Sequence, residues 1–189
     1  MCLPLRYPAV IAIKKGRFRH NLARFIGFLP FNQLRCLLYR TLFNYKISGS
    51  HIGWATTIAV DKAEIVDCII GRKNNFVGPM RIRLRKDVEI GYKNTFDCGW
   101  WTTDPEFLDR NYERCLDIGE NTLVTSNHFF DVVGELVIGR NSWIAGVGSQ
   151  LWTHGAGVCD RSIYIGDDCY VGSAVRIAPG TSIGSNNIV

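Results

Sequence analysis

The 189-residue chain lacks several features that mark common classes of protein. No apolar stretch approaches the roughly 20 residues that a membrane-spanning helix needs, and residues 1–13 contain no convincing signal peptide. The cysteines form no Cys-x-x-Cys pair and show no zinc-binding spacing; they are Cys2, Cys36, Cys68, Cys98, Cys115, Cys159 and Cys169. An odd, scattered set of this kind indicates free thiols in a reducing compartment, so we expect a cytoplasmic protein that needs no metal.

Acidic residues are absent from the beginning of the chain, because the first Asp or Glu is Asp61. The same stretch is rich in basic residues, interleaved with phenylalanine and leucine. These basic residues are Arg6, Lys14, Lys15, Arg17, Arg19, Arg24, Arg35, Arg40 and Lys46. Such a composition favours peripheral contact with an anionic membrane, here at its inner face. We see no recognition motif for nucleic acid and expect no such partner.

Residues 1–46 are predicted to form this basic arm, which is largely helical. Pro30 and Asn32 mark the start of a helix, and several of the residues that follow recur at helical spacing and so form a stripe along one face of it. The stripe contains Leu34, Leu37, Leu38, Thr41 and Leu42. Two roles stay open and can coexist: contact with a membrane surface, and a cap that closes the first turn of a repeat domain.

The repeat domain is marked by Ile-Gly pairs. From Ile52 onward they occur at Ile52, Ile70, Ile90, Ile118, Ile138, Ile165 and Ile183. Most spacings are multiples of six or close to them, and in the last turn Ile165, Val171, Ile177, Ile183 and Val189 follow at strict intervals of six. A fixed period is typical of a stacked solenoid. We therefore predict three short sides per turn with apolar side chains inside, and two insertions, within residues 97–115 and 152–162.

The segment from Ile165 to Gly184 (IGDDCYVGSAVRIAPGTSIG) resembles the hexapeptide-repeat acyltransferases, and the resemblance covers roughly residues 47–189. It implies an all-β fold, a left-handed parallel β-helix shaped as a triangular prism, which is an exception to right-handed crossovers. Residues 125–131 and 144–155 resemble a narrower group, the O-acetyltransferases of bacterial surface-polysaccharide gene clusters. That resemblance implies a homotrimer that transfers acetyl from acetyl-CoA to a hydroxyl of a sugar or lipid-linked sugar.

Acyl transfer to a hydroxyl needs a base, and histidine titrates in the suitable range. Of the histidines His20, His51, His128 and His154, the last lies at the mouth of the second insertion, where related sugar acetyltransferases carry their catalytic histidine. We therefore predict that His154 is the general base. The chain offers no nucleophile paired with a base at recognisable spacing, so we expect direct attack without a covalent intermediate.

Three residues on the preceding turn are candidates for assisting roles. The resemblance implies that a side chain near Asn127 helps to hold the acceptor. His128 is either a second polar contact or a surface residue. Asp131 either fixes a histidine tautomer or binds a sugar hydroxyl, unless it caps local backbone amides in a turn.

Tyr170, Gly172, Ser173 and Ala174 match the side of the family's prism that faces the coenzyme. A backbone amide there could stabilise the thioester oxyanion, although ordinary repeat filler is the alternative. The sequence stops in mid-repeat at Val189, without the further turns and basic tail of the family, so we expect the carboxyl terminus to be truncated. Tryptophans in the insertions, Trp100, Trp101 and Trp152, either stack on a sugar or pack the loops down.

Two other functions stay open at this stage. A γ-class carbonic anhydrase shares the repeat, but its zinc needs three histidine ligands, and only His128 and His154 lie in the right region. A non-catalytic β-helix scaffold is the other alternative, because fold alone does not establish activity.

Overall fold

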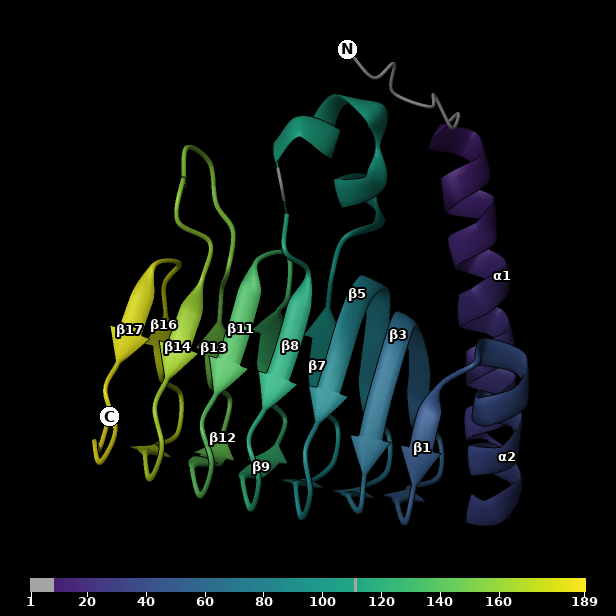
Figure 1. Ribbon diagram of the computed structural model, residues 1–189, viewed down its shortest axis with the longest axis horizontal. Coiled ribbons are helices and arrows are strands. Elements are labelled where there is room, and N and C mark those ends of the chain that lie inside the picture. Colours follow the sequence, from purple (N-terminus) through teal and green to yellow (C-terminus); the bar gives the residue numbers. More distant parts are fainter. Residues whose placement is uncertain (1–8, 111) are drawn as a thin grey trace.

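The computed structural model describes residues 9–110 and 112–189 and places two helices at one end of stacked rows of strands (Figure 1). The larger sheet contains β1 (Lys46–Ser48), β3 (Thr57–Val66), β5 (Asn75–Leu84), β7 (Thr95–Asp97), β8 (Cys115–Ile118), β10 (Phe129–Asp131), β11 (Glu135–Ile138), β13 (Gln150–Leu151), β14 (Ile163–Ile165), β16 (Arg176–Ile177) and β17 (Thr181–Ile183). The smaller sheet contains β2 (His51–Ile52), β4 (Ile69–Ile70), β6 (Glu89–Ile90), β9 (Leu123–Ser126), β12 (Trp143–Val147) and β15 (Tyr170–Val171).

The strands form three parallel rows, and each strand lies beside its counterpart in the next repeat. One row runs β1-β3-β5-β8-β11-β14-β17, and a second continues from β5 through β7, β10, β13 and β16. Strand β5 belongs to both rows, because Asn75–Val77 pair with β7 whereas Arg81–Leu84 pair with β8. The chain is therefore mostly parallel β-sheet, an arrangement compatible with a β-helix.

Side chains that point inward from equivalent strands stack to form the core. Phe76, Phe96 and Phe130 build a ladder with ring centroids 4.4 Å apart and planes within 6° of parallel. Isoleucines and valines fill the remaining interior. Of the positions predicted to face inward in the last turn, Ile165, Val171 and Ile177 are buried, whereas Ile183 is half-buried on the final strand.

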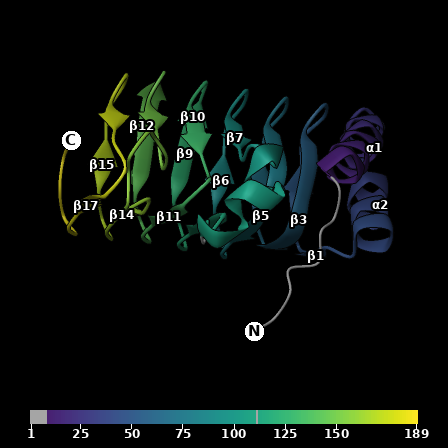
Figure 2. The same ribbon diagram turned by 90° about the horizontal axis from the view of Figure 1, so that it is seen from above.

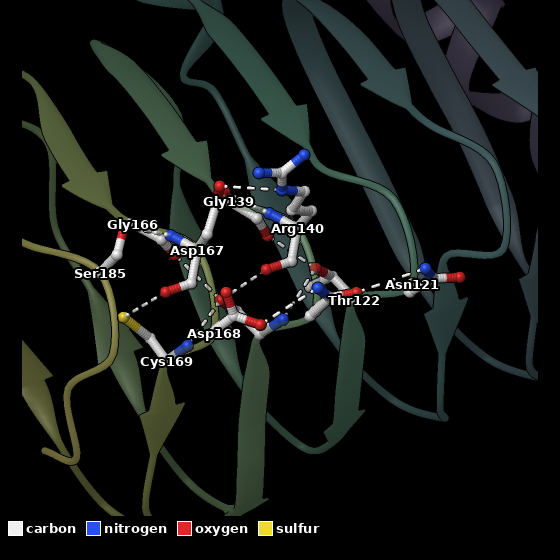
Figure 3. A network of polar contacts seen from close by, with 11 residues as sticks. Asn121, Thr122, Gly139, Arg140, Gly166, Asp167, Asp168, Cys169 and Ser185 are labelled. Carbon is white, nitrogen blue, oxygen red and sulfur yellow. Dashed lines mark hydrogen bonds and ion pairs between the residues drawn. The ribbon is translucent and has the colours of Figure 1, made fainter.

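Glycine is needed at the corners because successive repeats approach one another closely there. A Cβ on Gly71 would overlap the carbonyl of Gly91. Polar side chains strengthen these corners (Figure 3): the Arg140 and Asp167 side chains form an ion pair at 3.0 Å, and the Thr122 hydroxyl donates to the Gly139 carbonyl at 2.6 Å. These bonds join one repeat to the next and so fix the strand register.

Two helices cover the first repeat, α1 (Ala9–Gly27) and α2 (Asn32–Phe43), and both lie at the same end of the strand rows (Figure 2). This confirms the helical arm over its described residues; residues 1–8 lie outside them. Helix α2 turns Arg35, Cys36, Tyr39 and Phe43 inward, and Arg35 donates from Nε to the Ile52 carbonyl at 3.0 Å. The helices therefore cap the repeat domain, and no helix within the described residues is long and apolar enough to span a membrane.

Of the predicted apolar stripe of α2, only Leu38 packs against the core. Leu34, Leu37 and Leu42 are exposed, and Leu38 is only partly buried. Helix α1 likewise exposes Phe18 and Phe25 at 72% and 64% of their surface. The end of the molecule thus presents a large apolar surface that the cap function does not use.

Both predicted insertions leave the strand rows at the same edge (Figure 1). The first contains two short 3-10 helices, η1 (Trp100–Thr103) and η2 (Pro105–Arg110), and the second is an irregular loop over residues 152–162. The ring of Trp100 contacts Gly16, which ties the first insertion to α1. The six described cysteines are free, and four of them are buried.

Candidate active site

His154 and Asp131 form a hydrogen-bonded pair where the second insertion leaves β13. Nδ1 of His154 lies 2.8 Å from Oδ2 of Asp131, although the residues are 23 positions apart in the chain. The carboxylate side chain is 4% exposed and the imidazole 36% exposed. A buried acid thus holds a histidine whose ring reaches solvent.

The remaining bonds of Asp131 fix its orientation. Oδ2 also accepts from the backbone N–H of Thr153 and from its hydroxyl, both at 2.8 Å. Asp131 therefore orients a histidine, which is one of the roles that the sequence left open, and the backbone amide that it binds belongs to Thr153 in the next repeat and not to a local turn. Because a carboxylate only accepts, neutral His154 must carry its proton on Nδ1, which leaves the Nε2 lone pair free to take a proton.

Asp97 lies beside this pair and was not among the predicted site residues. In the register of the sheet Asp97 is the direct neighbour of Asp131, with Val77 on its other side. Burial raises the pKa of Asp97, the Asp131 carboxylate raises it further, and His154 acts in the opposite direction. A perturbed carboxylate beside a histidine is typical of functional sites.

Trp101 forms a wall of the site from the first insertion. Its ring centroid lies 5.6 Å from that of His154, and Phe107 and Tyr112 pack edge-on against it at 5.2 and 5.4 Å. The two insertions therefore meet at His154. Trp152 points elsewhere, since it is exposed and packs on Phe129 with centroids 4.7 Å apart.

His128 lies at the other end of β10 and is buried, with 2% of its surface exposed. Its Nδ1 accepts from the Ser149 N–H at 3.0 Å, so the proton of the neutral ring is on Nε2, 2.9 Å from the Thr125 hydroxyl. Burial lowers the pKa of His128. Both ring nitrogens are thus engaged in the interior, and neither is directed at a substrate within the protomer.

The neighbouring Asn127 is exposed in a left-handed turn with φ of 59°. Strand β10 separates both residues from His154, since three to four residues at about 3.3 Å each amount to 10–13 Å. The structure therefore unites His154 with Asp131 and leaves Asn127 and His128 apart from them. The two histidines that a zinc site would need together are separated by the same strand.

The predicted coenzyme segment stacks on the corner that follows β12. The Ser173 hydroxyl lies 3.3 Å from the Val147 N–H, and the Ala174 N–H donates to the Val147 carbonyl at 2.9 Å. Tyr170 and Ala174 are exposed and Gly172 is half-exposed. This segment precedes β16, whereas His154 follows β13, and these two strands are parallel neighbours. The segment and the His154–Asp131 pair therefore lie toward opposite ends of the two strands.

Asp97 left one detectable signal in the sequence. Residues 94–97 read Asn-Thr-Phe-Asp and residues 128–131 read His-Phe-Phe-Asp. In both of these consecutive repeats an inward Phe is followed directly by an Asp. Aligning the repeats would have placed both carboxylates on neighbouring strands. Trp101 gave no such signal, because its position depends on the path of the insertion.

In comparisons with known proteins, no family model, no curated protein and no solved structure matches the chain.

Proposed function

We propose that the protein is an O-acetyltransferase that moves acetyl from acetyl-CoA to a hydroxyl of a sugar or lipid-linked sugar in surface-polysaccharide assembly. The observation that carries this proposal is the His154–Asp131 pair, in which a buried carboxylate directs the free Nε2 of an exposed imidazole outward. The repeat pattern and the parallel rows support a left-handed β-helix of the hexapeptide-repeat acyltransferase type.

In this mechanism Nε2 of His154 takes the proton of the acceptor hydroxyl as its oxygen attacks the thioester carbonyl carbon. The C–S bond then breaks, and the imidazolium returns the proton to the departing thiolate, which gives an ester and the free coenzyme thiol. Asp131 keeps the imidazole in the productive tautomer and stabilises its positive charge, as the acid does in hydrolase triads.

The coenzyme would lie along Tyr170, Gly172, Ser173 and Ala174, in a groove between two subunits of a homotrimer. A subunit interface is needed because, within one chain, this segment lies away from His154. A backbone amide of the segment could then stabilise the oxyanion of the intermediate. Sedimentation of the purified protein as a species of three chains would support this part of the proposal, and a monomer would oppose it.

Contact with the inner face of an anionic membrane is part of the same proposal. The exposed apolar side chains Phe18, Phe25 and Leu37 lie on helices that contain no acid, beside exposed Arg17 and Arg40. Such a surface suits an anionic membrane, because the apolar side chains can insert among the lipids while the basic side chains are attracted to the anionic headgroups. A protein placed there would act peripherally, from the cytoplasmic side.

Acetyl transfer is tested by incubating the protein with acetyl-CoA and a panel of sugars and sugar phosphates while free thiol is measured. We expect His154→Gln to lower acceptor-dependent turnover by about 10²–10⁴-fold. His51→Gln is the matched control, since His51 is exposed on β2, away from the site. Full activity of His154→Gln, or no acceptor-dependent thiol release by the wild type, would reject the enzyme and favour a scaffold.

A further inference from the structure

A cavity of about 730 Å³ lies between α1 and the outward faces of β3, β5 and β7. Helix α1 contributes His20 and Arg24, the turn before β5 contributes Lys73, and β7 contributes Asp97. Its volume is in the range of small-molecule sites. The cavity therefore connects the cationic cap of the molecule with the strand next to the His154–Asp131 pair.

Strand spacing gives the distance from the helix end of the cavity to the His154–Asp131 pair, which lies one strand beyond Asp97. Thr57, Asn75 and Thr95 are neighbours in register on β3, β5 and β7, and Phe129 on β10 comes next. At about 4.8 Å per strand, the distance from β3 to the strand of Asp131 is about 14 Å. A ligand about 14 Å long that lies along the cavity and extends past Asp97 can thus have one end beside α1 and the other at His154.

Charge is distributed unequally along this cavity. Arg24 and Lys73 lie at the helix end, and within the described residues neither side chain takes part in an ion pair. Asp97 lies at the other end, where it would repel an anion. Two cations, with His20 as a third when protonated, suit the two or more charges of a phosphate or diphosphate better than the single charge of a carboxylate.

We propose that this cavity binds the acceptor, and that the acceptor is a phosphorylated sugar whose phosphate group contacts Arg24 and Lys73 while its hydroxyl reaches His154. This inference rests on the proposed acetyl transfer for the role of the hydroxyl. Asp97 orients the ligand, because it accepts hydrogen bonds from sugar hydroxyls and disfavours the phosphate near His154. Phe28 and Trp54 border the cationic end, with ring centroids 5.2 Å apart, and are half-exposed on the apolar cap surface.

Direct binding of inorganic pyrophosphate, measured by calorimetry at low salt, tests the site without the reaction. We expect the double variant Arg24→Gln/Lys73→Asn to bind at least tenfold more weakly than the wild type. Arg17→Gln/Lys93→Asn is the matched control. Lys73 and Lys93 both have left-handed backbone, with φ of 61° and 59°, and asparagine tolerates this conformation; Arg17 and Lys93 do not line the cavity.

Equal weakening in both double variants would overturn the proposal, because the effect would then be due to net charge alone. Absence of pyrophosphate binding by the wild type would also overturn it. Thermal unfolding of each variant checks that the fold is unchanged, as expected for exposed side chains. If the acetyl transfer proceeds on neutral sugars and the cavity variant leaves the KM of every acceptor unchanged, the inference fails while the proposed function stands. If pyrophosphate binding depends on Lys73 but no acceptor is acetylated, the proposed function fails while the anion site stands.

Two acceptor series then identify the source of the phosphate. One is a soluble nucleoside diphosphate sugar, and the other is a polyprenyl diphosphate sugar in vesicles. We expect the cavity variant to raise the KM of the true substrate at least tenfold with little change in kcat, because the phosphate contacts do not alter during acyl transfer. A lower kcat with unchanged KM for both series would contradict the assigned role.

Discussion

The role of Asp131 leads to a sharp prediction for the variant Asp131→Asn. In the wild type three donors share Oδ2: Nδ1 of His154 and the backbone N–H and hydroxyl of Thr153, each at 2.8 Å. An amide whose oxygen takes the place of Oδ2 still accepts all three bonds, and its NH₂ group takes the place of Oδ1. His154 therefore keeps its proton on Nδ1, and the variant removes only the negative charge beside the imidazole.

Loss of this charge weakens the stabilisation of the imidazolium that forms when Nε2 takes the substrate proton. We expect turnover to fall about 10–10²-fold, which corresponds to about 1.4–2.7 kcal/mol of transition-state stabilisation at 1.36 kcal/mol per tenfold, in line with the difference between a charged and a neutral hydrogen-bond partner. Since Asp131 acts through His154, the double variant Asp131→Asn/His154→Gln should be no slower than His154→Gln alone. Thiol release from acetyl-CoA in the presence of acceptor measures all three rates.

The tautomers themselves can be measured by ¹⁵N NMR of the histidine rings, independently of activity. The wild type should show the proton of His154 on Nδ1 and that of buried His128 on Nε2. In Asp131→Asn both tautomers should be unchanged, and the pKa of Asp97 should decrease because one of the causes that raise it has been removed. A wild-type His154 protonated on Nε2, or additive losses in the double variant, would refute this reasoning.

Three further predictions concern stability and the membrane. Phe96→Ala removes the middle ring of a stacked ladder and should lower the free energy of unfolding in urea by about 3–5 kcal/mol. Phe25→Ala, at an exposed position, should change it by less than about 0.5 kcal/mol. Equal losses in the two variants would contradict the assignment of the ladder to the core. Burial lowers the pKa of His128, so as pH falls below the ordinary value of about 6.5 the unfolded state binds the proton first; Tm should therefore drop between pH 7.5 and 5, and less steeply in His128→Gln. Flotation with anionic vesicles should recover the protein at low salt but not at 1 M salt, where the electrostatic screening length falls to ~3 Å. The double variant Phe18→Ser/Phe25→Ser should bind these vesicles more weakly. Equal recovery with neutral vesicles would mean that the helices act only as a cap.

The organisation of the fold was predictable because each repeat carries its own signal. Six-residue spacing of Ile165, Val171 and Ile177 requires these side chains to share an interior, and the structure buries all three. The Ile-Gly corners were predictable for the same reason, since a Cβ on the glycine of every pair except the last, at Gly184, would overlap the neighbouring repeat. Both insertions were located correctly because they interrupt a regular count.

Helix α2 shows where a local pattern was insufficient. Its leucine stripe marks an amphipathic helix but does not decide which face is covered. The structure covers the other face, because Tyr39 reaches the Ala23 and Thr56 carbonyls at 3.0 and 3.2 Å and Arg35 reaches that of Ile52. Buried hydrogen bonds to carbonyls of helix α1 and of the first repeat, which no local sequence reveals, thus outweighed the apolar stripe.

The sequence by itself determined the repeat and the inward side chains, since each depends on residue type and count within one repeat. His154 was chosen as candidate base from its place at the mouth of the second insertion and from the resemblance to sugar acetyltransferases. Only the tertiary structure decided that Asp131 binds His154, that Asp97 and Trp101 join them, and that His128 does not. These contacts join residues more than 20 positions apart across irregular insertions. Their geometry depends on strand register and on the path of two loops, and both are properties of the folded chain as a whole.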